Sequence, residues 1–407
     1  MKRALLLIVL LLFTVGAVFS LDFGLLMKHE LEVSNDIVFY SPSFTPWFSW
    51  DITKDISVYA SGVLFFEYYN YADDSDGSGW AKPEFRFDLS RTAVSWDISD
   101  NMSLEAGRVR YSDVLGFSAE GLFDGARFEM SLLPLGTLNA GVFFTGLLYK
   151  ETALILMSRN DEIRYEEPWD KDFSYYFASS RLLTNVGWEM PLFGEANTLS
   201  AEFLVQFDLN TRVDSNAEDK YYHSQYAEVK YEFYPLEEIG LTSGFILETM
   251  QNFTGAAAAW GFFAGMGVEM PGTLNDWVNL YVKFTSGSTN KEIPPFKPIT
   301  SVSQSEVLDN LPLSGLMVIS GDYNLRINKT MYTEAFLRYY IRTYDTNNEY
   351  AGKFFYGGEI WGAFFWQPFD DFRLTAGGGA FFPSLGDLRP DGTAPKWKVN
   401  VTLTMSF

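Results

Sequence analysis

Strict alternation of apolar and polar residues recurs along the chain and limits the folds open to it. The last eleven residues, WKVNVTLTMSF, place six apolar side chains on one face and five polar ones on the other. A period of two residues is that of a β-strand with one apolar and one wet face. The same pattern returns at 197–210, 226–234 and 331–343. The chain is therefore predicted to be all-β.

Eighteen such segments can be counted, and their connections alternate in length. The strands are predicted at 22–33, 43–53, 55–69, 82–98, 101–111, 121–133, 137–150, 177–190, 197–210, 221–234, 239–249, 258–270, 276–286, 314–328, 330–343, 354–367, 371–383 and 397–407. Links after even-numbered strands are short, whereas most links after odd-numbered strands are long and polar. This alternation is typical of a transmembrane antiparallel up-and-down β-barrel. Sixteen strands is the alternative if 22–33 and 43–53 do not both pair into the wall.

The N-terminal residues predict export. Residues 1–20 combine a basic start with an unbroken apolar run from Ala4 to Phe13, which is the pattern of a secretory signal peptide. Residues 21–407 are then one barrel domain, with both termini on the periplasmic side. Because backbone groups must be paired internally in hydrocarbon, only helices and closed barrels span membranes. The cell outer membrane is the expected location.

Composition excludes several classes of function. The net charge of −22 argues against a nucleic-acid partner, because the phosphate backbone attracts basic proteins. The chain has no cysteine and two histidines, His29 and His223, neither in a catalytic spacing, so no enzyme and no cofactor are predicted. The acids Asp73, Asp74 and Asp76 crowd one loop but lack the full spacing of a calcium loop. No metal site is predicted.

Two stretches resemble known proteins. The terminal strand with its final Phe407 resembles the assembly signal of bacterial outer-membrane proteins, which implies the barrel assembly machinery and outer-membrane lipids as partners. Residues 107–111, GRVRY, and 121–128, GLFDGARF, are together similar to a stretch of alginate-export-like porins with 16–18 strands. The resemblance implies a substrate porin.

The polar faces of the strands are predicted to line the lumen, where arginines gather on a few strands. The pore-lining candidates are Arg86, Arg108, Arg110, Arg127, Glu129, Arg326, Glu334, Arg338 and Arg342. The first four arginines fall on three consecutive strands and are expected to form a ladder. Ladders of charge set selectivity in pores, but nearby carboxylates also allow the arginines to brace the wall. Both interpretations stay open.

One strand breaks the simple pattern. Met102, Leu104 and Ala106 share parity with Arg108 and Arg110, so the arginines would face lipid if the strand were regular. Glycine within a strand often marks a bulge. A bulge at Gly107 is therefore predicted to turn these arginines inward.

The predicted function follows from width. Eighteen strands enclose a lumen too wide for wall side chains to fill, and the loops 151–176 and 287–313 are long enough to fold inward and narrow it. The sequence predicts a passive channel for small hydrophilic or anionic solutes, with sugar-like solutes as one option. A closed barrel acting as an adhesin or structural anchor is the alternative. The solute and the oligomeric state stay open.

Overall fold

The computed structural model describes residues 21–35, 37–71, 84–192, 197–210, 221–252, 255–270, 276–287, 295–345, 351–388 and 392–407. The predicted signal peptide at 1–20 and the acidic loop with Asp73, Asp74 and Asp76 lie outside these residues. Their assignments stay predictions. None of the described helices is long and apolar enough to cross a membrane.

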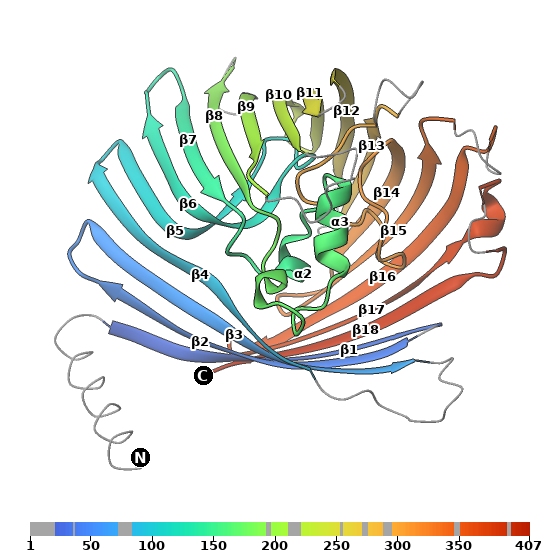
Figure 1. The fold of residues 1–407 in the computed structure, drawn as a ribbon, viewed down its shortest axis with the longest axis horizontal. Coiled ribbons are helices and arrows are strands. Elements are labelled where there is room, and N and C mark those ends of the chain that lie inside the picture. Colours follow the sequence, from blue (N-terminus) through green and yellow to red (C-terminus); the bar gives the residue numbers. More distant parts are fainter. Residues whose placement is uncertain are drawn as a thin grey trace, which may run out of the picture.

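Eighteen antiparallel strands form one closed ring in the described residues (Figure 1). The strands are β1 (Leu21–Ser34), β2 (Ile37–Asp51), β3 (Ile56–Tyr71), β4 (Glu84–Ser99), β5 (Met102–Ser112), β6 (Glu120–Ser131), β7 (Thr137–Phe144), β8 (Arg181–Pro191), β9 (Thr198–Asp208), β10 (Tyr222–Leu236), β11 (Ile239–Asn252), β12 (Gly255–Met270), β13 (Asp276–Thr285), β14 (Leu316–Arg326), β15 (Met331–Arg342), β16 (Phe355–Phe369), β17 (Phe372–Phe382) and β18 (Lys396–Ser406). Each strand pairs with its neighbour in sequence, and β1 also pairs with β18. The predicted barrel is confirmed, with eighteen strands rather than sixteen because β1 and β2 both pair into the wall.

The apolar residues of the alternating pattern lie on the outer face of the barrel, and the polar residues lie on the inner face. Along β18, Trp397, Val399 and Val401 are 36–44% exposed on the outer face, whereas the inward Lys398 is 8% exposed. Outward aromatic rings contact one another across strands, as Trp260 and Phe284 do with centroids 4.9 Å apart. An apolar outer band with aromatic residues is what a barrel wall presents to lipid.

The segments after β7 and β13 lie inside the ring (Figure 1). The first carries α2 (Lys150–Ala153), α3 (Arg159–Glu166) and η1 (Phe173–Tyr176), while η2 (Pro383–Leu385) follows β17. Met157 from the first segment and Phe296 and Ile299 from the second are completely buried. The described parts of both predicted inward loops therefore do fold inward, and the hydrophobic core lies inside the barrel.

Closure of the ring depends on the last strand. Phe407 exchanges two backbone hydrogen bonds of 3.0 Å with Leu25, at the end of the β1–β18 ladder. We predict that V401D, on the outer face, lowers the amount of folded barrel, because a carboxylate there must enter lipid. T402D, on the inner face of the same strand, is the matched control. Heat-modifiable mobility in membrane fractions measures the outcome, and equal folded levels for the two variants would contradict it.

Deletion of Phe407 tests the predicted assembly signal separately. We expect less folded protein in the outer-membrane fraction, because the closing ladder loses its last backbone pair and the exposed terminal ring is lost. Wild-type levels in the same assay would show that the residue is dispensable.

Candidate functional site

A hairpin leaves the wall and enters the lumen. The ladder between β4 and β5 ends at Thr92 and Arg108, and the ladder between β6 and β7 ends at Asp124 and Phe144. Beyond these pairs the strand ladder of β5 and β6 joins them only to each other. We call residues 109–123 the inner hairpin. Sequence analysis missed it because the segment reads as an ordinary strand pair.

The predicted bulge at Gly107 is wrong. The register of β5 continues without a shift through Gly107 on both sides. The register shift of the β4–β5 pair lies at Asp97 and Ser99, and that of the β3–β4 pair at Ala60 and Gly62. Gly107 has a φ of +132°, and a Cβ there would lie 2.1 Å from the carbonyl oxygen of Thr92. Only glycine fits this close approach at the point where the hairpin departs from the wall.

The tip of the inner hairpin is organised by one carboxylate. Asp113 accepts hydrogen bonds from the backbone N–H groups of four tip residues at 2.6–3.1 Å, those of Leu115, Phe117, Ser118 and Ala119. Such a set of bonds fixes a tight turn that no ladder could hold. These bonds give the tip a defined backbone conformation, which side chains of the inner wall then bind.

Carboxylates on the inner wall bind the inward segments through their backbone. Glu202 on β9 accepts the N–H of Val114 at 2.9 Å, and Glu228 on β10 accepts that of Leu115 at 3.2 Å. The segment before β14 is held in the same way. Glu248 on β11 accepts the N–H of Lys297 at 2.9 Å, and Glu359 on β16 accepts that of Glu306 at 2.9 Å. We call these four glutamates the anchor carboxylates.

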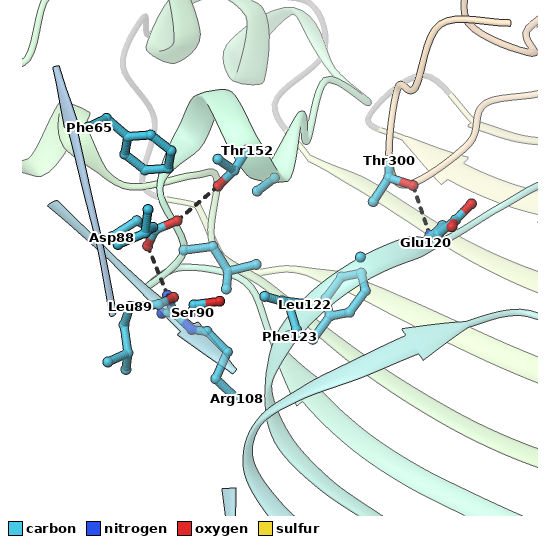
Figure 2. Close-up of a pocket in the computed structure, with 14 residues that line it drawn as sticks. Phe65, Asp88, Leu89, Ser90, Arg108, Glu120, Leu122, Phe123, Thr152 and Thr300 are labelled. Carbon is cyan, nitrogen blue, oxygen red and sulfur yellow. Dashed lines mark hydrogen bonds and ion pairs between the residues drawn. The ribbon is translucent and has the colours of Figure 1, made fainter. Parts of the chain in front are cut away.

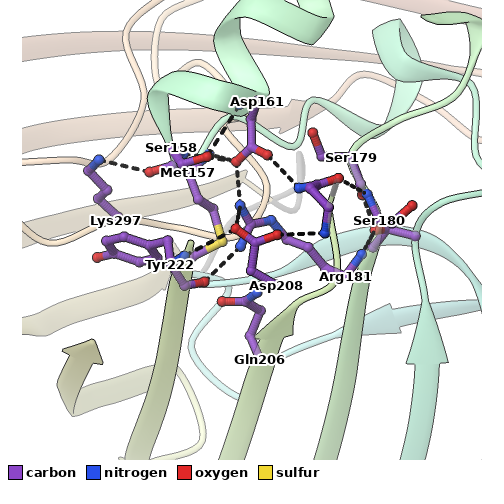
Figure 3. Close-up of polar contacts among 12 residues, drawn as sticks. Met157, Ser158, Asp161, Ser179, Ser180, Arg181, Gln206, Asp208, Tyr222 and Lys297 are labelled. Atoms are coloured by element: carbon purple, nitrogen blue, oxygen red, sulfur yellow. Dashed lines mark hydrogen bonds and ion pairs between the residues drawn. The ribbon is translucent and has the colours of Figure 1, made fainter. Parts of the chain in front are cut away.

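Helix α3 is held by a buried charge cluster (Figure 3). Ser158 and Asp161 form a capping box at the N-terminus of α3, and Asp161 also forms an ion pair with Arg181 of β8. Arg181 is completely buried and reaches Asp208 of β9 at 3.4 Å and the carbonyl oxygen of Tyr222 at 3.0 Å. A buried arginine needs this number of acceptors, so the cluster fixes α3 against the wall.

Two of the predicted ladder arginines are neutralised by carboxylates. Arg108 forms a two-point contact with Asp124 at 2.8 and 2.9 Å and an ion pair with Asp88 at 3.0 Å. Asp88 also accepts a hydrogen bond from Thr152 at 3.2 Å (Figure 2). Arg86 contacts the acids Glu67, Glu84 and Glu151 and the hydroxyl of Tyr149. Both side chains are at most 7% exposed.

The other two ladder candidates lie apart from these clusters. Arg110 is 75% exposed on the inner hairpin and pairs with Glu120 at 3.3 Å. Arg127 lies deeper on β6, is 41% exposed, and pairs with Glu129 at 3.3 Å. The four arginines therefore form separate ion pairs and not one continuous ladder. The structure favours the bracing interpretation for Arg86 and Arg108.

The remaining candidates lie on β14 and β15. Arg326 is exposed at the end of β14, and Glu334 is half-buried on the inner face of β15. Arg342 is 5% exposed, donates to the carbonyl oxygen of Lys353, and lies 5.3 Å from the ring centre of Tyr344. Arg338 lies over the ring of Phe336 at 3.7 Å.

Arg338 belongs to a cationic pair that sequence analysis did not single out. Its guanidinium donates to the backbone oxygen of Gln304 at 3.0 Å, and the ammonium of Lys283 on β13 lies 3.4 Å from the side-chain oxygen of the same residue. Neither cation has an ion-pair partner among the described side chains, and the buried Nε of Arg338 has no hydrogen-bond partner there. The alternation placed Lys283 on the wet face, but it could not show that Lys283 is unpaired.

Burial also shifts the pKa values of two side chains in the segment after β7, Lys150 and Tyr149. Lys150 of α2 donates to the backbone oxygens of Tyr165 and Glu167 at 2.6 and 2.7 Å, and burial lowers the pKa of its ammonium group. Burial, together with the nearby Glu151, raises the pKa of Tyr149. Tyr149 therefore stays a neutral hydrogen-bond partner of Arg86.

Comparison with solved structures identifies the fold. OccK5 (OpdH) of Pseudomonas aeruginosa is 9% identical, with a TM-score of 0.61 over 95% of this chain and 98% of that chain. The fold is that of an outer-membrane porin. The outer membrane protein opdK of the same species is 11% identical, with a TM-score of 0.60, and OccK2 (OpdF) in complex with glucuronate is 13% identical, with 0.57. Both alignments cover 95% of this chain and 98% of the other. At such identity the likeness shows the porin fold alone.

Sequence comparison adds no relative. No family model matches the chain, and no curated protein matches it. The interior of the porin fold must therefore be interpreted from its own residues.

Bracing by Arg108 has a measurable consequence. We predict that R108A lowers the free energy of unfolding by roughly 3–5 kcal/mol, the usual cost of leaving buried charges unpaired, with little change in ion selectivity. R110A is the matched control, because Arg110 is exposed and its ion pair contributes at most about 1 kcal/mol. Urea unfolding in lipid vesicles measures both. A selectivity change with unaltered stability would instead favour a track for solutes.

Release of an inward segment should widen the lumen. Glu359 accepts hydrogen bonds from the hydroxyls of Ser305 and Tyr340, both at 2.6 Å, besides its bonds to the loop backbone. We expect E359A to raise single-channel conductance and its noise, because the segment before β14 loses its anchor. E129A, which breaks only a half-exposed pair with Arg127, should leave conductance unchanged. Identical traces for the two variants would contradict the anchoring role.

Proposed function

We propose that the chain is a passive outer-membrane channel for small hydrophilic solutes, with a preference for anionic ones. The observation that supports this proposal is the cationic pair Lys283 and Arg338 on the inner wall beside Gln304. The neutralised Arg86 and Arg108 leave no charge for a solute. A guanidinium without a carboxylate partner binds solute carboxylates by charge-assisted hydrogen bonds.

Two proteins of similar fold support small carboxylates as the solute class. OccK2 (OpdF) was crystallised in complex with glucuronate, and OpdK was crystallised with vanillate. Both are small organic molecules with one carboxylate. The alginate-export-like resemblance stays a prediction, and the residues that carry it, 107–128, build the inner hairpin and its base on the wall.

The remaining assignments belong to the same proposal. The barrel lies in the cell outer membrane, with outer-membrane lipids around its apolar face, and the assembly machinery recognises the terminal strand with Phe407. Of the nine candidates named from the sequence, Arg338 is the one that this proposal places in contact with the solute. The absence of enzymatic activity stays a prediction. His29 contacts the hydroxyl of Tyr40, and His223 accepts a backbone N–H from Asp208.

Reversal potentials test the proposal. In a planar bilayer under a salt gradient, we expect the wild type to conduct and to favour anions over cations. K283A/R338A should shift the reversal potential towards cations, because two cations without an ion-pair partner are removed from the lumen wall. R110A/R127A removes the same charge from residues that already have carboxylate partners, and is expected to change selectivity less. Block by glucuronate should weaken only in the first variant.

Two results would reject the proposal. A folded barrel that does not conduct at any applied voltage would favour the adhesin or anchor. Equal selectivity changes in the two double variants would mean that Lys283 and Arg338 have no special part in it.

A further inference from the structure

The wall has a sector that no strand closes. Above Thr92 and Arg108, the edge of β4 at residues 84–91 loses its partner, because β5 turns inward as the inner hairpin. Between Ser99 and Thr92 the wall rises roughly 18 Å, at about 3.3 Å per residue and a tilt of about 40°. A barrel presents an apolar band about 25 Å tall to lipid. The open sector therefore begins within that band.

Side chains, and not a ladder, cover the open sector. Within the described residues, no backbone hydrogen bond joins residues 84–91 to the segment after β7. Instead, side chains join them: Arg86 pairs with Glu151 and donates to the hydroxyl of Tyr149, Thr152 donates to Asp88 at 3.2 Å, and the hydroxyl of Tyr176 donates to the backbone oxygen of Phe87. We call residues 145–177 the lid. A cover held by side-chain contacts alone opens without the loss of a strand ladder.

The outer rim of the sector is apolar. Phe85 and Phe87 on β4 are 54% and 51% exposed, and Leu147 and Phe173 of the lid are 57% and 63% exposed. Charged rims face water, whereas an apolar rim of this kind is compatible with lipid.

A cavity of about 280 Å³ lies behind the lid. Val63 and Phe65 of the inner wall, Leu122 of the inner hairpin, and Ala153 of the lid supply apolar surface. Polar groups lie at both ends, with Asp88, Thr152 and Arg108 at one and Glu120 and Thr300 at the other (Figure 2). The cavity therefore lies between the wall, the inner hairpin and the lid. Its size, its apolar surface and the polar groups at its ends suit a small amphipathic molecule with a polar head and an apolar ring or short chain.

We propose that this sector is a lateral portal, through which small amphipathic solutes pass between the cavity and the outer leaflet. This second route is independent of the axial channel proposed above. The hairpin that narrows the lumen is also the element whose departure leaves the wall open. One structural device thus creates both the constriction and the portal.

Labelling of a single cysteine tests the portal. The chain has no native cysteine, so V63C, on the wall of the cavity, is the only thiol in its variant. Protein in lipid vesicles is treated with N-octyl maleimide, which partitions into the bilayer, or with a sulfonated maleimide, which stays in water. We expect V63C to react with the octyl reagent, and A363C, on the inner wall of β16 away from the lid, to react with the sulfonated reagent only.

Two changes at the lid sharpen the test. Y176F removes the hydrogen bond to Phe87 and should speed octyl labelling of V63C about fivefold, as expected for the loss of one hydrogen bond. A153W fills the cavity and should slow it. Heat-modifiable mobility and axial conductance establish that each variant is folded.

Three results would overturn the portal. Labelling of V63C by the sulfonated reagent alone would mean that the cavity communicates only with water. Equal reactivity of V63C and A363C towards the octyl reagent would mean that the reagent reaches the cavity through the lumen and not from the bilayer. Octyl labelling unchanged by both Y176F and A153W would mean that the lid does not control access.

Discussion

Backbone N–H groups that enter the barrel must find acceptors there, and the carboxylates of the inner wall supply them. Each of the anchor carboxylates Glu202, Glu228, Glu248 and Glu359 receives at least one N–H from a segment that has left the wall or the rim. An unpaired buried N–H costs about as much as a lost hydrogen bond. Without these acceptors the inward segments would have no stable position, and the lumen would have no constriction.

The inward carboxylates as a group determine which positive charges inside the barrel are neutralised. Acids that face inward bind either backbone, as Glu359 does, or arginine, as Asp124 does with Arg108. Arg86, Arg108, Arg110 and Arg127 are all paired with acids in this way. The number of charges on the inward faces therefore overstates the charge that a solute meets. Lys283 and Arg338 differ because the group between them is the neutral Gln304. Selectivity in such a lumen is set by the cations left without an acid.

The inner hairpin links the interior to the wall. Tyr111 donates to Glu202 at 2.7 Å, and Val109 is completely buried, so the end of β5 gains a core by leaving the sheet. The sheet loses a ladder at the edge of β4, and the lid replaces that ladder with side-chain contacts. The inner hairpin thus gains packing contacts inside the barrel, while the edge of β4 loses the backbone hydrogen bonds of a strand ladder.

The sequence by itself determined the ring. Period-two alternation fixes which residues face lipid, because a one-residue slip would move a whole apolar face into the lumen. The eighteen segments therefore lie where they were predicted, within a few residues, except at the rim. There β2 begins at Ile37, β7 ends at Phe144 and β8 begins at Arg181, because lipid no longer imposes the pattern.

Only the tertiary structure decided what fills the ring. The tip at Asp113 and the loop residue Gln304 follow no periodicity, and their positions depend on acceptors that lie on strands far away in the sequence. Apolar Val109, Tyr111 and Phe123 on the inner face were the one signal for the inner hairpin, since a wet lumen wall has no need of them. Alternation places Lys283 and Arg338 inward, but whether an inward charge is neutralised depends on its neighbours across the sheet and above it. Those neighbours are set by contacts between segments that lie far apart in the chain. The order of residues in the sequence does not show which distant segments will meet.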